Sequence, residues 1–284
     1  MNFISAKELL ELCERDNITI SQAMINRETQ CLGGEKAALY ERMERALAIM
    51  RDGVRLSLSA PQKSMGGLIG GEAIKLTEHR SKGKAVCGDM MSKAVTYAMG
   101  MLEVNASMGL IVAAPTAGSC GVLPAALLAQ QEEFSFSDKE LFEVMFTASA
   151  VGYIIARNAT ISGAEGGCQA EVGAASAMAA AAVTQLHGGS PAQCLHAAGI
   201  AIVNILGLVC DPIRGLVEVP CQTRNAMGVS NALVAAELAL SGIHSPAPFD
   251  EVVATMASVG RSLPCELRET ALGGIACAPS AIGS

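Results

Sequence analysis

Apolar residues recur along most of this chain three and four positions apart, in blocks separated by turns rich in glycine or proline. This spacing places apolar side chains on one face of an α-helix. It predicts helices over residues 6–16, 21–58 with an interruption at 33–34, 89–108, 138–158, 169–186, 192–209, 225–240 and 250–262. Strict alternation, which marks a half-buried strand, is nearly absent, and 215–219 is a weak candidate. We therefore predict an all-α fold, a compact helical domain with glycine-rich loops.

Local signals support several of the predicted helix starts. Serine, a favoured N-cap residue, precedes three of them, at Ser5, Ser137 and Ser190. Glu8 and Glu140 complete two capping boxes, and Pro191 occupies a first helical position. Asp89 is predicted to cap the helix that follows it.

The composition favours closely packed helices and argues against a membrane span. Of the 284 residues, 51% are hydrophobic, yet small and aliphatic side chains carry this share, and there is no tryptophan. The length allows one large domain or two small ones, and we expect a single domain over residues 1–284. The most apolar run, 194–210, contains His196 and Asn204 and falls short of the ~20 residues that a spanning helix needs. We expect a soluble chain with no membrane partner.

Charge and cysteine content narrow the function further. The N-terminus lacks a basic segment followed by an apolar one, so no secretory signal is predicted and the expected location is the cytoplasm. A net charge of −7 without a basic block argues against a nucleic-acid partner. Ten cysteines in a cytosolic chain are unsuited to a disulfide framework. Some of them are expected to bind metal or to act chemically, and the rest to fill the core.

Two glycine-rich loops are candidates for ligand binding. Residues 59–71 contain four glycines and place Lys63 next to Ser64, which suits a small anionic ligand, although a plain linker has the same composition. Residues 113–124 precede another predicted helix. A loop at a helix N-terminus presents free N–H groups to an anion such as a carboxylate.

Three cysteines stand at junctions between an apolar helical stretch and a turn marked by glycine or proline: Cys168, Cys210 and Cys221. Thiolates from three such turns can converge on a soft metal. Zinc is disfavoured because no Cys-x-x-Cys pair occurs, and spacings of forty-two and eleven residues are not a ferredoxin pattern. From spacing alone a metal site competes with the reading of buried, apolar cysteines.

Several long stretches closely resemble the α chain of the iron–sulfur L-serine dehydratases. They are residues 113–121, 166–173 and 210–228, with further matches at 63–67 and 266–274. The resemblance implies a 4Fe-4S cluster held by Cys168, Cys210 and Cys221, with one iron left open as a Lewis acid. It also implies deamination of L-serine to pyruvate and ammonia without pyridoxal phosphate.

The resemblance also implies a partner. Members of the family need a smaller β portion that carries a Ser-His-Thr-Met-Gly-Pro type motif, and this motif does not occur here. We therefore expect a separate β subunit and an oligomer. Some fused relatives place a C-terminal cysteine against the open iron, and the last cysteine here is Cys277, seven residues before the end.

The loops and the cysteine motifs supply the expected substrate contacts: Lys63, Ser64, Thr116, Gly118, Ser119 and Asn225. A solvated loop lysine and a helix-capping asparagine are the alternatives for Lys63 and Asn225. The general base is not identified from the sequence. The histidines (His79, His187, His196 and His244) are expected to be structural, and Glu165 and Glu171 either tune the cluster or are ordinary carboxylates at a helix start.

Packing or surface roles are expected for six other cysteines: Cys13, Cys31, Cys87, Cys120, Cys194 and Cys265. Three alternative functions remain open. A cysteine desulfidase-like lyase would keep the cluster and change the substrate, and a metal-binding subunit without catalysis would keep only the cluster. An enzyme with pyridoxal phosphate is disfavoured because the glycine loops lack a clear Schiff-base lysine.

Overall fold

The computed structural model of the chain describes residues 2–31, 33 and 35–282, and within them it is all-α, as predicted, with no β-strand. The α-helices are α1 (Ala6–Asp16), α2 (Ile20–Cys31), α3 (Lys36–Ser59), α4 (Glu72–Ser81), α5 (Gly88–Ala106), α6 (Val122–Phe134), α7 (Asp138–Asn158), α8 (Gly163–Gly166), α9 (Cys168–Leu186), α10 (Pro191–Val203), α11 (Cys221–Leu240), α12 (Phe249–Ser262) and α13 (Pro279–Ile282). Short 3-10 turns cover Ile213–Gly215, Cys265–Leu267 and Gly274–Cys277. No helix of the described part of the chain has both the length and the apolarity to cross a bilayer.

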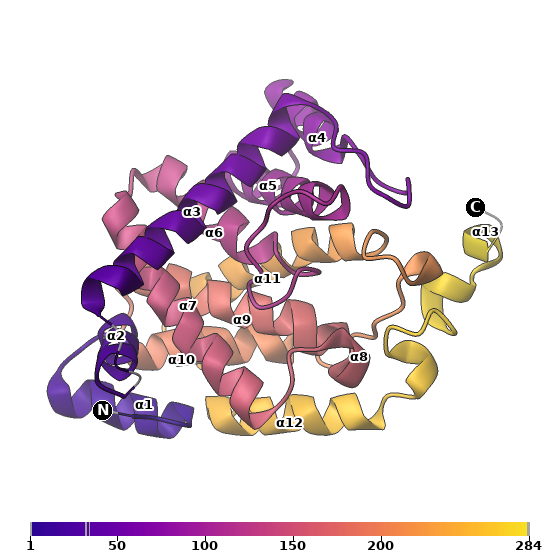
Figure 1. Ribbon diagram of the computed structural model, residues 1–284. Coiled ribbons are helices and arrows are strands. Elements are labelled where there is room, and N and C mark those ends of the chain that lie inside the picture. Colours follow the sequence, from indigo (N-terminus) through magenta and orange to yellow (C-terminus); the bar gives the residue numbers. More distant parts are fainter. Residues whose placement is uncertain (1, 32, 34, 283–284) are drawn as a thin grey trace.

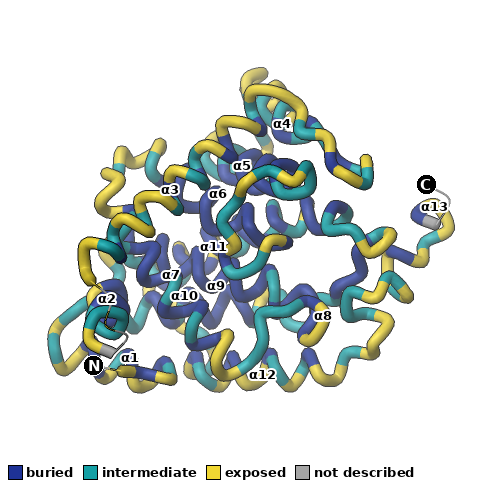
Figure 2. Tube along the Cα trace, viewed as in Figure 1, coloured by how far each residue is buried: buried dark blue, intermediate teal, exposed yellow. Residues whose placement is uncertain are grey.

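Helix α9 lies at the centre of the fold, with α7, α10 and α11 packed around it (Figure 1). Almost all of its residues are buried, as Figure 2 shows, and eight of its 19 residues are alanine. Small side chains let neighbouring backbones come close. At Gly228 of α11 an added Cβ would lie 2.7 Å from Cγ1 of Val172 on α9. The first residue of α9 is therefore held by a dense core.

The long connections collect at the end of the molecule that also carries the C-terminal segment (Figure 1). Hydrogen bonds join these connections to one another. Ser64 binds Glu218, and Cys210 pairs with the chain around Arg268. All three cysteine motifs open onto this loop end of the fold.

The helix starts with a serine cap are confirmed. The side chains of Ser5, Ser137 and Ser190 each accept a hydrogen bond from the backbone N–H three residues later. Ser137 forms a full capping box with Glu140, and Ser190 forms one with Gln193. These signals work because both partners lie within one turn of the sequence.

Other predictions of secondary structure were wrong. Asp89 is not an N-cap but lies in the first turn of α5, where its carboxylate pairs with Arg80 of α4. Helix α10 ends at Val203 rather than 209, because the chain turns through Gly207 at φ +85° to bring Leu208 to the start of α9. The backbone N–H of Gln169 donates to the carbonyl of Leu208 across 3.0 Å.

Near the third cysteine the chain is more helical than expected. Helix α11 starts at Cys221, four residues before the predicted start, so Asn225 lies inside the helix and does not cap it. The weak strand candidate at 215–219 is not a strand. Helix α4 was missed altogether, because its N-terminal N–H groups are satisfied from far away in the sequence. Glu103 of α5 accepts from Gly71 and Ala73 at 3.0 and 2.9 Å.

Candidate metal centre

Three buried cysteines lie at turns that are remote in the sequence, and the thiols of Cys168 and Cys210 interact directly. Cys168 is the first residue of α9, and Cys221 is the first residue of α11. Cys210 lies between α10 and α11, where its backbone pairs with the segment around Arg268. All three are free and buried. Two ends of long helices and one paired segment thus fix the three thiols.

The thiols interact with one another and with a nearby cation. A hydrogen-bond interaction with the Cys210 thiol lowers the pKa of Cys168, against the effect of burial, and the positive charge of Arg224 lowers it further. The same interaction, together with burial, raises the pKa of Cys210. Burial raises the pKa of Cys221 to about 12, and negative charge at Cys168 adds to this rise. The thiols therefore share one electrostatic environment.

Arg224 ties two of the cysteine motifs together. Its Nη1 donates to the carbonyl of Val209 at 2.8 Å, and its Nη2 donates to Asp211 Oδ1 at 2.6 Å. Asp211 Oδ2 accepts the backbone N–H of Ile275 at 2.7 Å. Arg224 thus binds the residues before and after Cys210, and Asp211 also holds the C-terminal segment. Neither Arg224 nor Asp211 was given a role from the sequence, although both lie in the 210–228 stretch that resembles the family.

The 113–121 loop meets α9 one turn after Cys168. Thr116 donates its hydroxyl to Glu171 Oε1 at 2.6 Å, and the hydroxyls of Thr116 and Ser119 are 2.9 Å apart. At Gly118 an added Cβ would lie 2.6 Å from the same carboxylate oxygen. Burial raises the pKa of Glu171, and the charge of Glu269 contributes to the rise.

Asn225 holds this loop from α11. Its Nδ2 donates to the carbonyls of Gly118 and Cys221 at 2.7 and 2.9 Å, and its Oδ1 accepts the N–H of Gly121 at 2.9 Å. The side chain is completely buried. Asn225 therefore positions the loop beside Cys221.

A glycine marks the point where the acidic groups approach the thiols. A Cβ at Gly163 would lie 3.0 Å from Sγ of Cys210, 3.3 Å from Oε2 of Glu171 and 3.4 Å from Oε2 of Glu269. Glu269, which was not singled out from the sequence, has φ +64° and donates its N–H to the carbonyl of Cys210 at 2.6 Å. Two carboxylates and the Cys210 thiol thus lie close to the Cα of Gly163, which carries no side chain.

The 59–71 loop is organised by a carboxylate of the protein itself. Glu218 accepts from the Ser64 hydroxyl and from the N–H groups of Gly66 and Leu68, at 2.7, 2.6 and 2.9 Å. Ser64 is buried, whereas Lys63 is exposed. The sequence suggested that donors of this loop bind an anionic ligand. In the structure they bind Glu218 and so hold the loop against the segment before Cys221. Glu218 lies in that segment. Its role is visible only from its hydrogen bonds in the folded chain.

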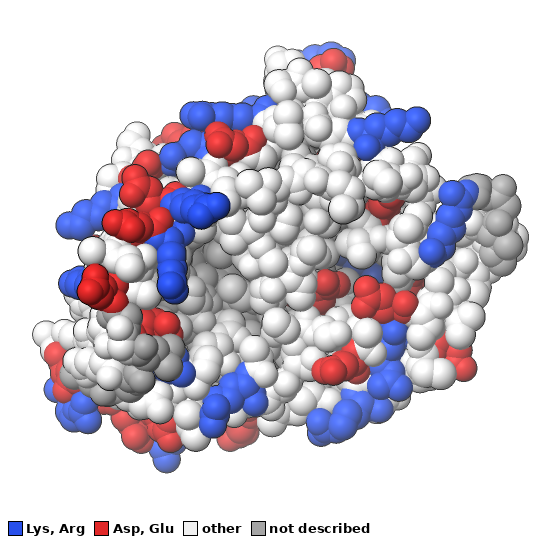
Figure 3. All heavy atoms as spheres, viewed as in Figure 1, with Lys and Arg blue, Asp and Glu red and all other residues white. Residues whose placement is uncertain are grey.

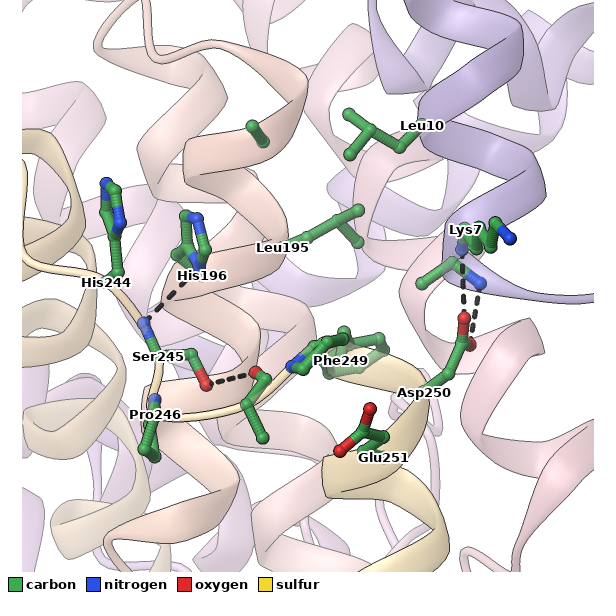
Figure 4. Close-up of a pocket in the computed structure, with 14 residues that line it drawn as sticks. Lys7, Leu10, Leu195, His196, His244, Ser245, Pro246, Phe249, Asp250 and Glu251 are labelled. Atoms are coloured by element: carbon green, nitrogen blue, oxygen red, sulfur yellow. Dashed lines mark hydrogen bonds between the residues drawn. The ribbon is translucent and has the colours of Figure 1, made fainter.

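One cavity of the described residues has none of the three cysteines in its lining. It measures about 590 Å³ between α1, the start of α10 and the start of α12 (Figure 4). His196 and His244 stack there with ring centroids 4.4 Å apart, and His196 Nδ1 accepts the N–H of Ser245 at 3.3 Å. Asp250 accepts the N–H groups of Ala6 and Lys7 at the start of α1. These polar groups are engaged in holding the fold.

Cys120 packs with Cys221 in a small apolar cluster, whereas the other described cysteines and the histidines form no hydrogen bond with the three thiols. Burial raises the pKa of the Cys13, Cys120 and Cys194 thiols to about 12. Cys87, Cys265 and Cys277 are exposed, and the side chain of Cys31 lies outside the described residues. His187 contacts Gln130 with its Nε2 at 2.7 Å, while His79 lies in the last turn of α4.

No group of three or more histidine, cysteine, aspartate or glutamate side chains within 2–31, 33 and 35–282 is arranged to hold a single metal ion. A cubane cluster makes a different demand, because each thiolate binds a different iron and the sulfurs do not meet at one point. Three free thiols beside a guanidinium offer three of the four thiolates that such a cluster takes.

Fold and site together define a helical protein with a buried three-thiol centre beside glycine-rich loops. The family model of the serine dehydratase alpha chain matches residues 15–276, and the chain belongs to this family.

The similarity to known relatives extends over nearly the whole chain. The probable L-serine dehydratase alpha chain of Bacillus subtilis is 46% identical over 278 residues, which cover 98% of this chain and 92% of the relative. The L-serine dehydratase alpha chain of Peptoniphilus asaccharolyticus is 44% identical over 272 residues, covering 96% and 93%. The L-serine dehydratase of Helicobacter pylori is 36% identical over 280 residues, covering 97% of this chain but 61% of the relative.

Proposed function

We propose that this chain is the alpha subunit of an iron–sulfur L-serine dehydratase, a lyase that converts L-serine to pyruvate and ammonia. The observation that supports the proposal is a group of three buried, unpaired cysteines: Cys168 interacts directly with Cys210, and its charge acts on Cys221. Arg224 lies close enough to lower the pKa of Cys168. The names of the relatives supply the substrate. Overall, serine loses its Cα proton and its β hydroxyl as water, and hydrolysis of the resulting imine takes up one water and releases ammonia.

Cys168, Cys210 and Cys221 would hold a 4Fe-4S cluster in this proposal. The cluster would supply a Lewis-acidic iron that makes the serine hydroxyl a better leaving group. Arg224 would offset the negative charge that three thiolates bring into a buried place. Asp211 would keep the guanidinium in position.

The loops next to the thiols would bind and orient the substrate. Thr116 and Ser119 bring hydroxyl groups to the side of Glu171, and Gly118 lets the backbone approach closely. Lys63 would bring positive charge for the substrate carboxylate, and Ser64 would shape the loop around it. Asn225 would act by holding the 113–121 loop in place.

A second polypeptide would complete the enzyme. This chain corresponds to 61% of the Helicobacter pylori relative, whereas it covers more than nine-tenths of the alpha chains. A separate beta subunit would supply the remaining portion and the base that takes the Cα proton, within an oligomer. We also propose that residues 1–284 act as one catalytic domain and that the enzyme works in the cytoplasm, without nucleic acid or membrane as a partner.

Anaerobic reconstitution with iron and sulfide tests the proposal. We expect Cys168→Ser, Cys210→Ser and Cys221→Ser each to lower cluster content and to abolish serine turnover in the presence of the beta subunit. Cys194→Ser, which changes a buried cysteine of α10 outside the site, is the matched control and should retain both. Three variants with unchanged cluster absorbance and turnover would refute the assignment. Turnover of serine, threonine and cysteine side by side separates the dehydratase from a cysteine desulfidase-like lyase.

A further inference from the structure

A second cavity is lined by residues of two segments that lead to Cys168 and Cys210. It measures about 440 Å³ and is bounded by α8, the C-terminal end of α12 and the turn that precedes Glu269. The volume falls in the range of small-molecule sites. Acidic and basic atoms gather over α8 and the end of α12 on the face shown in Figure 3.

Two arginines line this cavity. Hydrogen bonds lower the pKa of the exposed Glu266 carboxylate, and the charge of Arg268 lowers it further. Neither Arg261 nor Arg268 forms an ion pair with any described residue. The Nε of Arg268 is buried and has no hydrogen-bond partner in the part of the chain that the structure describes. A buried donor of this kind costs free energy unless a ligand satisfies it.

A carboxylate lines the same cavity as the two arginines. Oε2 of Glu165 accepts the hydroxyl of Thr160 at 2.5 Å, and both residues line the cavity. The lining thus contains both positive and negative side chains. A ligand that carries a carboxylate and an ammonium group matches both charges.

We propose that this cavity binds a small α-amino acid. Its carboxylate would lie between the guanidinium groups of Arg261 and Arg268, which suit planar, bidentate anions. Its ammonium group would donate to Glu165. A simple anion would satisfy the arginines but would be repelled by the glutamate, so the charge pattern selects a zwitterion.

The position of the cavity connects it to the three-thiol centre. The residues on either side of Arg268 pair with Cys210. The N–H of Cys210 donates to the carbonyl of Leu267 at 2.9 Å, and the N–H of Glu269 donates to the carbonyl of Cys210 at 2.6 Å. The other wall continues through Gly166 and Gly167 into Cys168. A ligand that spans the two walls would fix the relative positions of Cys168 and Cys210. Occupancy and cluster binding would then strengthen each other.

Calorimetric titration of the full chain without its cluster tests the proposal independently of turnover. The probes are L-alanine, which has no β leaving group, and propionate, which has the same carbon skeleton without the ammonium group. We expect saturable binding of L-alanine and much weaker binding of propionate. Arg261→Gln and Arg268→Gln should each weaken L-alanine binding by at least about tenfold, the size of one lost charged hydrogen bond. Glu165→Gln should reduce the preference for L-alanine over propionate.

Arg55→Gln is the matched control, because it removes an exposed arginine on α3 and should leave binding unchanged. Circular dichroism melting checks that each variant folds. If Arg268→Gln does not fold, Arg261→Gln gives the test from an exposed side chain. The proposal is overturned if L-alanine shows no saturable binding, if neither arginine variant changes it, or if propionate binds equally well. It is also overturned if the variants weaken only the association with the beta subunit, since the cavity would then be a subunit contact.

Discussion

Arg224 and Asp211 form a largely buried ion pair, with Nη2 and Oδ1 2.6 Å apart and side chains 14% and 6% exposed. Arg224 lies in the first turn of α11, which begins at Cys221, and Asp211 directly follows Cys210. The second oxygen of Asp211 holds the C-terminal segment at Ile275. One pair of side chains therefore sets the relative positions of two of the proposed ligands.

Removing the carboxylate of this pair should destabilise the fold and the cluster together. Asp211→Asn leaves the guanidinium buried without its counter-charge, so we expect the free energy of unfolding to fall by about 3 kcal/mol. Urea denaturation of the cluster-free chain measures this loss, and iron content after reconstitution should fall as well. Asp52→Asn breaks an exposed pair with Arg55 and should cost less than about 1 kcal/mol. Equal losses in the two variants would contradict a special role for Asp211.

Gly118→Ala should separate substrate handling from cluster binding. The new methyl group would meet Oε1 of Glu171 at 2.6 Å and push the 113–121 loop away from α9. We expect a loss of serine turnover of at least about tenfold, because a displacement of about 1 Å is costly at a reacting centre. Cluster absorbance should be retained. The control is Gly173→Ala on α9, where the nearest atom is the flexible end of Ile205 at 3.3 Å.

Glu218 should control access to the 59–71 loop. Replacing it with alanine removes the acceptor of the Ser64 hydroxyl and of two loop N–H groups. Each lost bond is worth about 1 kcal/mol, so local opening should increase by at least about tenfold. Limited trypsin digestion, followed by mass spectrometry, should show faster cleavage after the exposed Lys63. Cleavage after Lys82, at the end of α4, should not change. An unaltered rate at Lys63 would show that the loop is held by other contacts.

Thiol labelling should follow burial and pKa. The thiolate is the reactive form, and a pKa of about 12 leaves roughly one Cys194 or Cys13 thiol in ten thousand ionised at pH 8. We expect iodoacetamide to modify the exposed Cys87, Cys265 and Cys277 in the native chain. Cys194 and Cys13 should react only after denaturation, even at pH 9, since the pKa stays above that value. Labelling of Cys194 in the folded chain would contradict the dense core around α10.

Much of the fold could be predicted because its signals are local. Ser137 and Glu140 lie within one helical turn, so the start of α7 is written in four consecutive residues. Helix α4 lacks such a signal, since the carboxylate that caps it comes from Glu103, thirty-two residues after Gly71. Asp89 was wrongly predicted as an N-cap for a related reason. Its carboxylate pairs with Arg80, which belongs to another helix.

The site shows the same division. Spacing alone did not distinguish metal-binding cysteines from buried ones, and the choice of Cys168, Cys210 and Cys221 came from the resemblance to the family. The groups that support them, Glu218 and Arg224, act through bonds to residues far along the chain. Such partners become visible only when the segments are folded together. The substrate contacts drawn from the sequence stay predictions, with Asn225 now assigned to positioning the loop.

Two of the proposed ligands are the opening residues of α9 and α11, which pack against each other in the alanine-rich core. Their sulfur positions are thus set by hydrophobic burial and not by the metal, unlike those of small zinc modules that unfold when stripped. If the proposed cluster is present, a chain built in this way would remain folded after oxygen removes the inorganic centre, and would take up iron and sulfide again without being synthesised anew.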